Sequence, residues 1–429
     1  MPELTRAILL LMLIWVPSAF AGELSRLYQD ALNHDADYAA SLANYRAGLE
    51  KLPQARSALL PQIQLNANAL QNRTDLSIAP VQNYSSNSAS VNVTQPLFRQ
   101  ANLSQYEQAK QQSHANVALL DSKQQDLILR VASAYFDVLL AQDNLYVLQS
   151  LKTAIDRQLA LAKANFAAGT STVTDSDEAQ ARSDLTAAQL ISAQNDLYIK
   201  QQSLSVLTGT PPIMLAGLDK QRPLPPVALN QLDNWITEAV QNNPQIRIEQ
   251  ANMKIAEAEI TRARSGHLPT LDAVASYTDN RNQLFGNTFI NSRSGNIGLA
   301  LNIPLYQGGL VDSRIREAEA NKDKASQELL ASSRQIELGI RQAAYNTNSQ
   351  AAQVTAYTQA VNAALTSLES SKLGLTVGVR TNIDVLNAQQ QYYAAQRDLA
   401  AARYGYWLAK LRLKANEGAL NETDLAAIN

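Results

Sequence analysis

The sequence predicts an α+β membrane protein in which short amphipathic strands and very long helices arise from an internal duplication. Three observations support this fold class. One stretch of sequence occurs twice, several segments alternate apolar and polar residues, and other segments run for great lengths without proline. The chain has 429 residues, which is enough for two or three ordinary domains or for one very elongated domain.

Residues 1–21 have the features of a secretory signal peptide. Arg6 precedes the apolar run AILLLMLIWV, and Pro17 and a small-residue site at 19–21 follow it, which predicts cleavage before Gly22. An uncleaved membrane anchor is the alternative, but about ten apolar residues cannot cross a hydrocarbon core of ~30 Å. The signal peptide and the absence of cysteine are together typical of a protein of the Gram-negative envelope.

The composition narrows the function classes. Charged residues make up 17% of the chain and the net charge is -2, so no excess of Lys and Arg is available to bind nucleic acid. After the signal peptide no run approaches the roughly eighteen apolar residues of a transmembrane helix. The mature chain is therefore expected either to be soluble or to cross a membrane as strands.

The duplication is visible over most of the mature chain. ARSALLPQIQL at 55–65 returns as ARSGHLPTLDA at 263–273, an offset of 208 residues. The same offset aligns QPLF with IPLY, and one further residue aligns a G-x-x-T-x-x-D pattern at 169–175 with its copy at 378–384. Two copies of one supersecondary unit are therefore present.

Each copy is expected to contain a helical opening, a β-hairpin and two long helices, with a Pro-rich joint between the copies. The helical openings are expected at 24–58 and 232–265. The predicted divisions of the chain are the signal peptide at 1–21, a first repeat at 22–210, a joint at 211–231, a second repeat at 232–415 and a C-terminal segment at 416–429. In the first repeat the hairpin is expected at 62–98 and the long helices at 100–208. In the second repeat the hairpin is expected at 270–305 and the long helices at 310–415.

The strands are recognised by an alternation with a period of two, which places apolar side chains on one face and polar side chains on the other. The clearest case is the run Ile297, Leu299, Leu301, Ile303 and Leu305 against Asn296, Gly298 and Asn302. The polar stretches at 74–87 and 279–292 are expected to be the connecting loops of the two hairpins.

The long helices are recognised by composition and spacing. No proline occurs between Pro96 and Pro211, and a continuous helix is expected from Asn102 to Asn165, about 95 Å long at ~1.5 Å per residue. Its apolar residues follow the 4,3 spacing of a coiled coil, with Lys152 as the one charged residue among them. The residues of this seam are Leu127, Val131, Ala134, Val138, Ala141, Leu145, Leu148, Ile155 and Leu159.

Four amphipathic strands need a partner for their apolar face. A soluble sandwich is one solution, but the chain offers no second apolar layer near the strands. In a bilayer, strands can satisfy all of their backbone groups only in a closed barrel, because an open sheet leaves its edges unpaired. A sheet of four strands is too small to close alone. Two protomers would give about eight strands and a filled interior, whereas three give about twelve and leave a lumen. The sequence therefore predicts a homotrimer with a twelve-stranded β-barrel.

Several segments resemble the TolC family of outer membrane exit ducts. They include ARSALLPQ, HLPTLD, IPLYQGGLV at 303–311, VGVRTNIDVLNA and LAAARYGY at 399–406. The resemblance implies a β-barrel that is embedded in the lipid of the outer membrane and is continued by a long α-helical coiled-coil barrel across the periplasm. It also implies partners, namely a periplasmic adaptor (membrane fusion) protein and an inner-membrane transporter of the RND, ABC or MFS type, for efflux or type I secretion.

The two copies of G-x-x-T-x-x-D hold the candidate site. Locally, Gly169 and Gly378 are expected to end one helix as left-handed caps, and the Thr and Asp to start the next as a capping box. The resemblance implies more, since these turns form the periplasmic mouth in the family. It matches Arg380 to a gating arginine, Thr174 and Asp175 to its partners, and Asp384 to an acidic selectivity ring.

The sequence departs from the family's pattern at two positions of this mouth. Leu375 stands where a gating tyrosine is found, and Asn387 stands where a second ring aspartate is found. The closed state of the mouth is therefore expected to be held less firmly, and the ring is expected to carry less negative charge. The surface that meets an adaptor is expected to include Gly169, Gly378, Val379 and Arg380, because glycine permits close backbone approach.

Catalysis finds no support in the sequence. The three histidines lie in separate helical contexts, and no phosphate loop, metal spacing or acid and base pairing is present, so neither an enzyme nor a cofactor is expected. A soluble periplasmic coiled-coil scaffold protein remains the alternative to a transport duct. The transported substrate cannot be read from the residues.

Overall fold

The structure is a computed structural model that describes residues 22–211, 214–219, 222–284 and 288–428. The predicted signal peptide lies outside the described residues. The chain divides into two compact units. The sheet unit comprises residues 43–120 and 245–333, and the helical unit comprises the remaining described residues. Each unit is built from both halves of the duplicated sequence.

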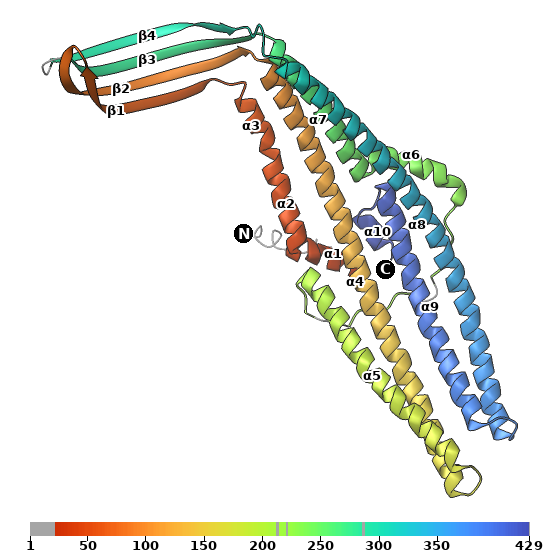
Figure 1. Cartoon of the computed structure of the whole chain (residues 1–429). Helices are drawn as coiled ribbons and strands as arrows, with labels where there is room; N and C mark the ends of the chain where they lie inside the picture. The colour runs from red at the N-terminus through yellow and green to blue at the C-terminus, as the bar shows by residue number, and fades with distance from the viewer. Residues whose placement is uncertain (1–21, 212–213, 220–221, 285–287, 429) are drawn as a thin grey trace, which may run out of the picture. The chain divides into compact units, whose positions relative to one another are not determined.

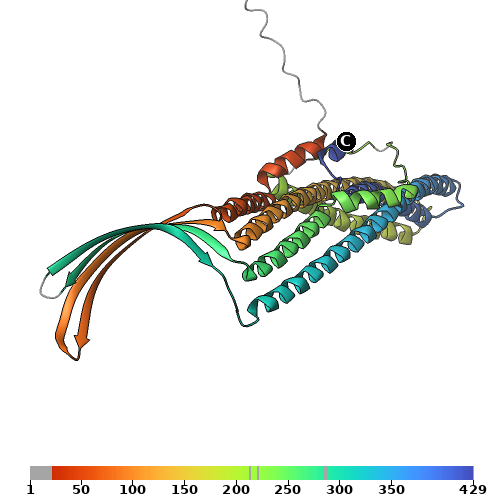
Figure 2. The ribbon, with the colours of Figure 1, turned by 90° about the horizontal axis from the view of Figure 1, so that it is seen from above.

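The sheet unit contains one antiparallel sheet in the order β1-β2-β3-β4 (Figure 1). Its strands are β1 (Gln62–Leu76), β2 (Ala79–Phe98), β3 (Thr270–Leu284) and β4 (Thr288–Asn302). The sheet is strongly curved (Figure 2). Because β1 and β4 are the outer strands, each keeps one edge that pairs with no other described strand of the protomer.

The register of the sheet aligns the apolar side chains of all four strands. Ile63 pairs with Val93, Val93 with Ala275, and Ala275 with Ile297, which makes a continuous apolar row across the sheet. The adjacent row on the other face is polar throughout, and its members are Gln64, Asn92, Ser276 and Asn296. Since paired residues lie on the same face, the predicted division into an apolar and a polar face is confirmed.

The apolar face is uncovered in the protomer. The side chain of Ile297 is 88% exposed, and those of Ile63 and Leu65 are each 72% exposed. Such a large apolar surface is costly in water and indicates that another phase or another molecule covers it.

The predicted hairpin loops at 74–87 and 279–292 are wrong, because most of these residues are strand. β1 continues to Leu76 and β2 begins at Ala79, so only Ser77 and Ile78 separate them. β3 continues to Leu284, and β4 begins at Thr288. Backbone ladder bonds do not depend on side-chain polarity, so the sheet continues where alternation fades. Polar side chains on neighbouring strands also bond there, as in the 2.9 Å hydrogen bond from Asn72 to its diagonal neighbour Ser86.

Helices precede and follow the strands at one end of the sheet. α3 (Lys51–Ser57) precedes β1, α4 (Gln100–Ala167) follows β2, α7 (Pro244–Arg264) precedes β3 through the short η2 (Ser265–His267), and α8 (Leu310–Thr376) follows β4. The Arg99 guanidinium, just before α4, donates a 2.8 Å hydrogen bond from Nε to the buried carboxylate of Asp272 on β3. This ion pair joins the two halves of the duplicate at the helix–strand boundary.

The helical openings are broken rather than continuous. The first consists of α1 (Glu23–His34), α2 (Ala36–Leu49) and α3, and the second of α6 (Leu232–Asn242), after the short η1 (Leu229–Gln231), and α7. Asp35 and Asn243, which are equivalent in the duplicate, adopt extended ψ values of 117° and 125° at the breaks. The Asp35 carboxylate accepts a 2.7 Å hydrogen bond from the backbone N–H of Tyr38, so a capping side chain starts the next helix.

The helical unit contains most of α4 and α8, with α5 (Val173–Thr208), α9 (Asn382–Glu417) and the short α10 (Glu422–Ala426). The predicted coiled-coil seam of α4 is buried or half-buried along its whole length. Leu127, Val131 and Val138 are fully buried in the main core, which also takes up Leu425 and Ile428 near the C-terminus. Among the described residues, no helix has an apolar stretch long enough to cross a membrane.

Candidate gate at the helix tips

Two tight turns, one between α4 and α5 and one between α8 and α9, carry the candidate site. Gly169 and Gly378 have φ values of 75° and 78°, a left-handed conformation that costs glycine little. The N–H of Thr170 donates to the Asn165 carbonyl at 2.9 Å, and the N–H of Val379 donates to the Gly374 carbonyl at 2.9 Å. These bonds satisfy the last carbonyls of each helix, so the predicted glycine caps are confirmed.

A capping box starts the helix after each turn, as the repeated motif predicts. Thr172 accepts a hydrogen bond from the backbone N–H of Asp175 at 3.3 Å, and the Asp175 carboxylate accepts one from the N–H of Thr172 at 3.3 Å. Thr381 and Asp384 make the same reciprocal pair at the start of α9. These two boxes stabilise the helix ends and set the direction of α5 and α9.

Both tip carboxylates are held in the charged form. The Ser171 hydroxyl donates a 2.6 Å hydrogen bond to Asp175 and, together with the donors of Thr172, keeps the pKa of that carboxyl below its usual range. The backbone N–H of Thr381 and then its hydroxyl lower the pKa of Asp384. Both groups therefore carry full negative charge at neutral pH.

Arg380 lies against its own hairpin in the protomer. Its guanidinium is 3.8 Å from the Asp384 carboxylate, and its backbone N–H donates to the Gly374 carbonyl at 3.1 Å. A side chain at Gly374 would meet the Arg380 Cγ at 2.5 Å, so the missing side chain makes room for the arginine stem. Contact of Arg380 with the exposed Thr174 and with Asp175 across neighbouring helices stays a prediction.

The two positions that depart from the family's pattern are both occupied by packed or bonded side chains. Leu375 lies against a small apolar cluster of Leu368, Val385 and Ala388 between α8 and α9. Asn387 accepts a 3.1 Å hydrogen bond from Arg182 on α5, whose other terminal nitrogen donates to Gln390 at 2.7 Å. Arg182 thus links α5 to α9 through hydrogen bonds to two uncharged side chains.

A buried asparagine joins the two hairpins and was missed by the sequence analysis. The side chain of Asn382, which is 8% exposed, donates to the backbone carbonyl of Asp175 on α5 at 3.3 Å. Its oxygen accepts a short hydrogen bond from the Gln158 amide on α4. We call Asn382, Gln158 and the Asp175 carbonyl the tip clasp. The equivalent position in the first half of the duplicate is Val173, and this difference between the copies is the signal that was available.

An apolar cluster supports the tip clasp. It comprises Leu151, Ile155 and Ala162 of α4, Ala179 of α5 and Leu386 of α9, so three helices meet in one small core close to the turns. Tyr393 of α9 packs against it. The candidate gate therefore consists of polar contacts at the turns above a thin layer of apolar packing.

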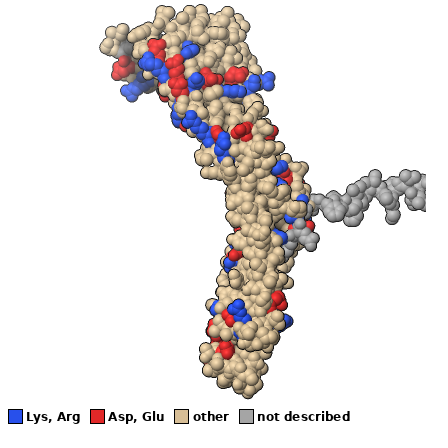
Figure 3. Space-filling view, turned by 90° about the vertical axis from the view of Figure 1, so that its right-hand side faces the viewer, with Lys and Arg blue, Asp and Glu red and all other residues tan. Residues whose placement is uncertain are grey.

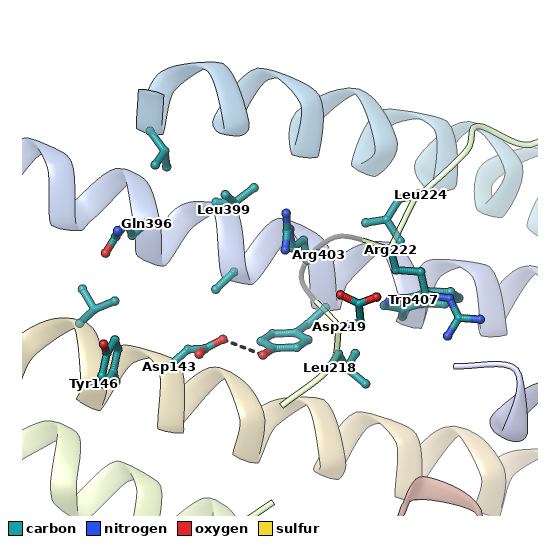
Figure 4. A pocket seen from close by; sticks show the side chains of 14 residues that line it. Asp143, Tyr146, Leu218, Asp219, Arg222, Leu224, Gln396, Leu399, Arg403 and Trp407 are labelled. Carbon is teal, nitrogen blue, oxygen red and sulfur yellow. Dashed lines mark hydrogen bonds between the residues drawn. The ribbon is translucent and has the colours of Figure 1, made fainter. Parts of the chain in front are cut away.

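A second feature of the helical unit is a pocket of about 210 Å³ between α4, α9 and the joint (Figure 4). The buried hydroxyl of Tyr404 donates a 2.6 Å hydrogen bond to Asp143 in this pocket. The Arg222 guanidinium of the joint lies 5.3 Å from the ring centre of Trp407 and also donates a 2.9 Å hydrogen bond to the Ile428 carbonyl. These contacts fasten the joint and the C-terminal residues to α9.

A family model described as "Outer membrane efflux protein" matches residues 27–210 and 235–419. The chain belongs to the outer membrane efflux protein family. The two matched stretches correspond to the two halves of the duplicate.

Related members of the outer membrane efflux protein family align over nearly the whole chain. The outer membrane protein TolC of Vibrio cholerae is 35% identical over 415 residues, which cover 96% of this chain and 94% of that protein. The proteases secretion protein PrtF of Dickeya chrysanthemi is 30% identical over 425 residues, covering 95% of this chain and 90% of that protein.

Solved structures of outer membrane channels share the fold. VceC of Vibrio cholerae superposes with a TM-score of 0.79 at 19% identity, covering 92% of this chain and 96% of that one. CusC superposes with a TM-score of 0.81 at 16% identity, covering 93% of both chains.

The predicted TolC-family membership, α+β fold and outer membrane location are confirmed by these relatives. Members of the outer membrane efflux protein family are components of efflux or secretion systems, and they are channels rather than enzymes. The alternative of a soluble periplasmic scaffold is therefore set aside. The chain is an outer membrane exit duct.

Proposed function

We propose that the chain forms a homotrimeric conduit in which three four-stranded sheets close into one twelve-stranded barrel. The observation that carries this proposal is the amphipathic sheet with its outer strands β1 and β4 unpaired in the protomer. Pairing of β4 with β1 of the next protomer would satisfy both edges. The apolar rows would then face lipid, and the polar rows would line a lumen.

The helical part would extend this conduit across the periplasm and end at the tips. The Pro-rich joint at 211–231 and the C-terminal segment at 416–429 would form a belt around it. That role is supported by the contacts of Arg222 and by burial of Leu425 and Ile428 in the main core.

The tips would form a gate that is closed at rest. Arg380 would pair with Thr174 and Asp175 of a neighbouring helix, and three copies of Asp384 would surround the axis as a selectivity ring with Asn387 beside it. Support comes from the low pKa of Asp384, which keeps three negative charges in a confined, cation-attracting space at neutral pH. Leu375 would contribute packing in place of a polar latch.

A periplasmic adaptor protein and an inner-membrane transporter of the RND, ABC or MFS type would open the gate. The turns expose Gly169, Gly378, Val379 and Arg380, and Val379 is 76% exposed, so a partner helix could approach the backbone closely. One relative is named for solvent efflux and another for protease secretion, and a passive duct is compatible with both activities.

The proposal is tested on the purified protein. Native mass spectrometry should give the mass of three chains, and a monomeric or dimeric mass would refute barrel closure by three protomers. In planar bilayers, Arg380→Ser should raise the single-channel conductance because one charge-assisted contact per protomer is removed from the closed state. Lys372→Ser, which removes an exposed cation from the last turns of α8, is the matched control. Unchanged conductance in assembled Arg380→Ser would remove Arg380 from the gate.

A further inference from the structure

All three arginines of the described strands lie on the same face of the sheet, and it is the apolar face. Arg73 of β1, Arg281 of β3 and Arg293 of β4 occupy the positions that continue the apolar rows toward the hairpin ends. The opposite face at the same level of β3 and β4 carries uncharged partners, such as Asn280 paired with Ser292. Three positive charges therefore appear where the apolar surface ends, on the side proposed to face lipid, together with the negative charge of Asp279.

Arg281 and Arg293 are close neighbours on this face. Arg293 pairs directly with Asp279, which is two residues from Arg281 on the same strand, so the two arginines are diagonal neighbours about 7–8 Å apart in backbone position. Arg293 donates a 3.0 Å hydrogen bond from Nε to the Asp279 carboxylate. That bond holds the guanidinium through Nε alone, and the side chain is 72% exposed.

The depth of the pair in a membrane follows from strand geometry. Arg281 lies ten residues beyond Leu271, the first apolar residue of this face on β3. At ~3.3 Å per residue this is about 33 Å of strand, and a tilt of ~40° converts it to about 25 Å of height. An outer membrane barrel has an apolar band about 25 Å tall. Arg281 therefore lies at the boundary of the hydrocarbon, where the headgroups begin, and Arg293, which pairs with Asp279, lies two residues or about 5 Å deeper in the band.

Helices join the other end of the sheet, so the hairpin ends with Arg281 and Arg293 point away from the periplasm. This statement rests on the proposed orientation of the barrel. A guanidinium at this boundary can extend toward the aqueous side and bind a phosphate through parallel hydrogen bonds. We propose that Arg281 and Arg293 bind a phosphate on the headgroup of an outer-leaflet glycolipid, with Asp279 positioning Arg293.

The test measures binding of bisphosphorylated lipid A to the assembled, purified channel by native mass spectrometry. The wild-type protein should bind this lipid at least about tenfold more tightly than lipid A with both phosphates removed, because charge-assisted hydrogen bonds are lost. Arg281→Gln with Arg293→Gln should weaken binding of the phosphorylated lipid by a similar factor. Arg264→Gln removes an exposed cation outside the sheet and should leave binding unchanged.

A second pair of variants keeps the test decisive if the double glutamine variant does not assemble. Arg281→Lys with Arg293→Lys retains the charge but loses the planar fork of donors, and it should bind the phosphorylated lipid several-fold more weakly than wild type. Wild-type affinity in either assembled double variant would overturn the proposal. A wild-type protein that is trimeric and conducting but does not distinguish the two lipids would overturn this inference and leave the proposed function intact.

Discussion

Replacing Asn382 by Val should shift the proposed gate toward its open state. Asn382 makes two hydrogen bonds, to the Gln158 amide and to the Asp175 carbonyl, and so contacts both arms of the α4–α5 hairpin. Valine is a suitable replacement because Val173 occupies the equivalent position at the start of α5, where it is compatible with the helix. The substitution therefore removes the tip clasp without disturbing the capping box of α9.

The magnitude follows from these two bonds. Each contributes about 0.5–1.5 kcal/mol net, and water can solvate the half-buried Gln158 amide once Asn382 is gone, so about 1–2 kcal/mol is lost per protomer. If three protomers open together, the loss sums to about 3–6 kcal/mol. Since about 1.4 kcal/mol is a tenfold change, the closed population relative to the open one should fall by roughly two to four orders of magnitude.

Single-channel recording in planar bilayers measures this shift as a higher conductance or a longer open time. Asn362→Val, at an exposed position of α8, is the matched control and should behave as wild type. Gln158→Leu should produce a smaller rise, and the double variant should fall short of the sum because both changes break the same bond. An assembled Asn382→Val channel with wild-type currents would refute the idea that the clasp holds the gate.

Three further predictions concern the barrel, the ring and the pH dependence. Ile297→Arg should impair trimer assembly in heat-modifiability assays because an arginine facing lipid costs ~2–4 kcal/mol near the midplane, whereas Asn296→Arg on the polar face should assemble; equal behaviour would mean that the faces are misassigned. Asp384→Asn should weaken cation selectivity and block by multivalent cations with little change in the open population, and unchanged block would leave Asp384 as a helix cap alone. Burial raises the pKa of Glu417 to about 7 from 4.5, so the folded state binds this proton more tightly and stability should fall as the pH rises from about 4.5 to about 7. Glu417→Gln should remove that slope and raise the melting temperature at pH 8 but not at pH 4; an unaltered slope would assign it to another group.

The main core is well described by periodicity, but the helix breaks and strand lengths are not. The coiled-coil seam of α4 follows from its 4,3 spacing, because a long helix can bury only the stripe that faces its partners. The break at Asp35 depends on a single capping residue of a type that also occurs within unbroken helices, and the break at Asn243 stands directly before Pro244, which begins α7 and favours an extended residue in front of it. The strands beyond the apolar band depend on their paired neighbours, because the local sequence there is polar and reads as loop.

Positive and negative side chains are interspersed on the face shown in Figure 3, in agreement with the small net charge of the chain. What matters for function is the placement of a few groups. The three strand arginines can be assigned to the apolar face by counting residues, but only the pairing of β3 with β4 brings Arg281 next to Arg293.

The sequence by itself determined the duplication, the two faces of the sheet, the long helices and the glycine caps with their capping boxes. These features depend on residues that are neighbours in sequence or recur at a fixed spacing, so local pattern is sufficient to predict them. The tertiary structure alone decided that Asn382 meets Gln158, that Arg182 meets Asn387, and that Leu375 lies in an apolar cluster. In the first two cases residues about two hundred positions apart come together, and a buried polar group becomes a clasp only when packing supplies its partner and excludes water.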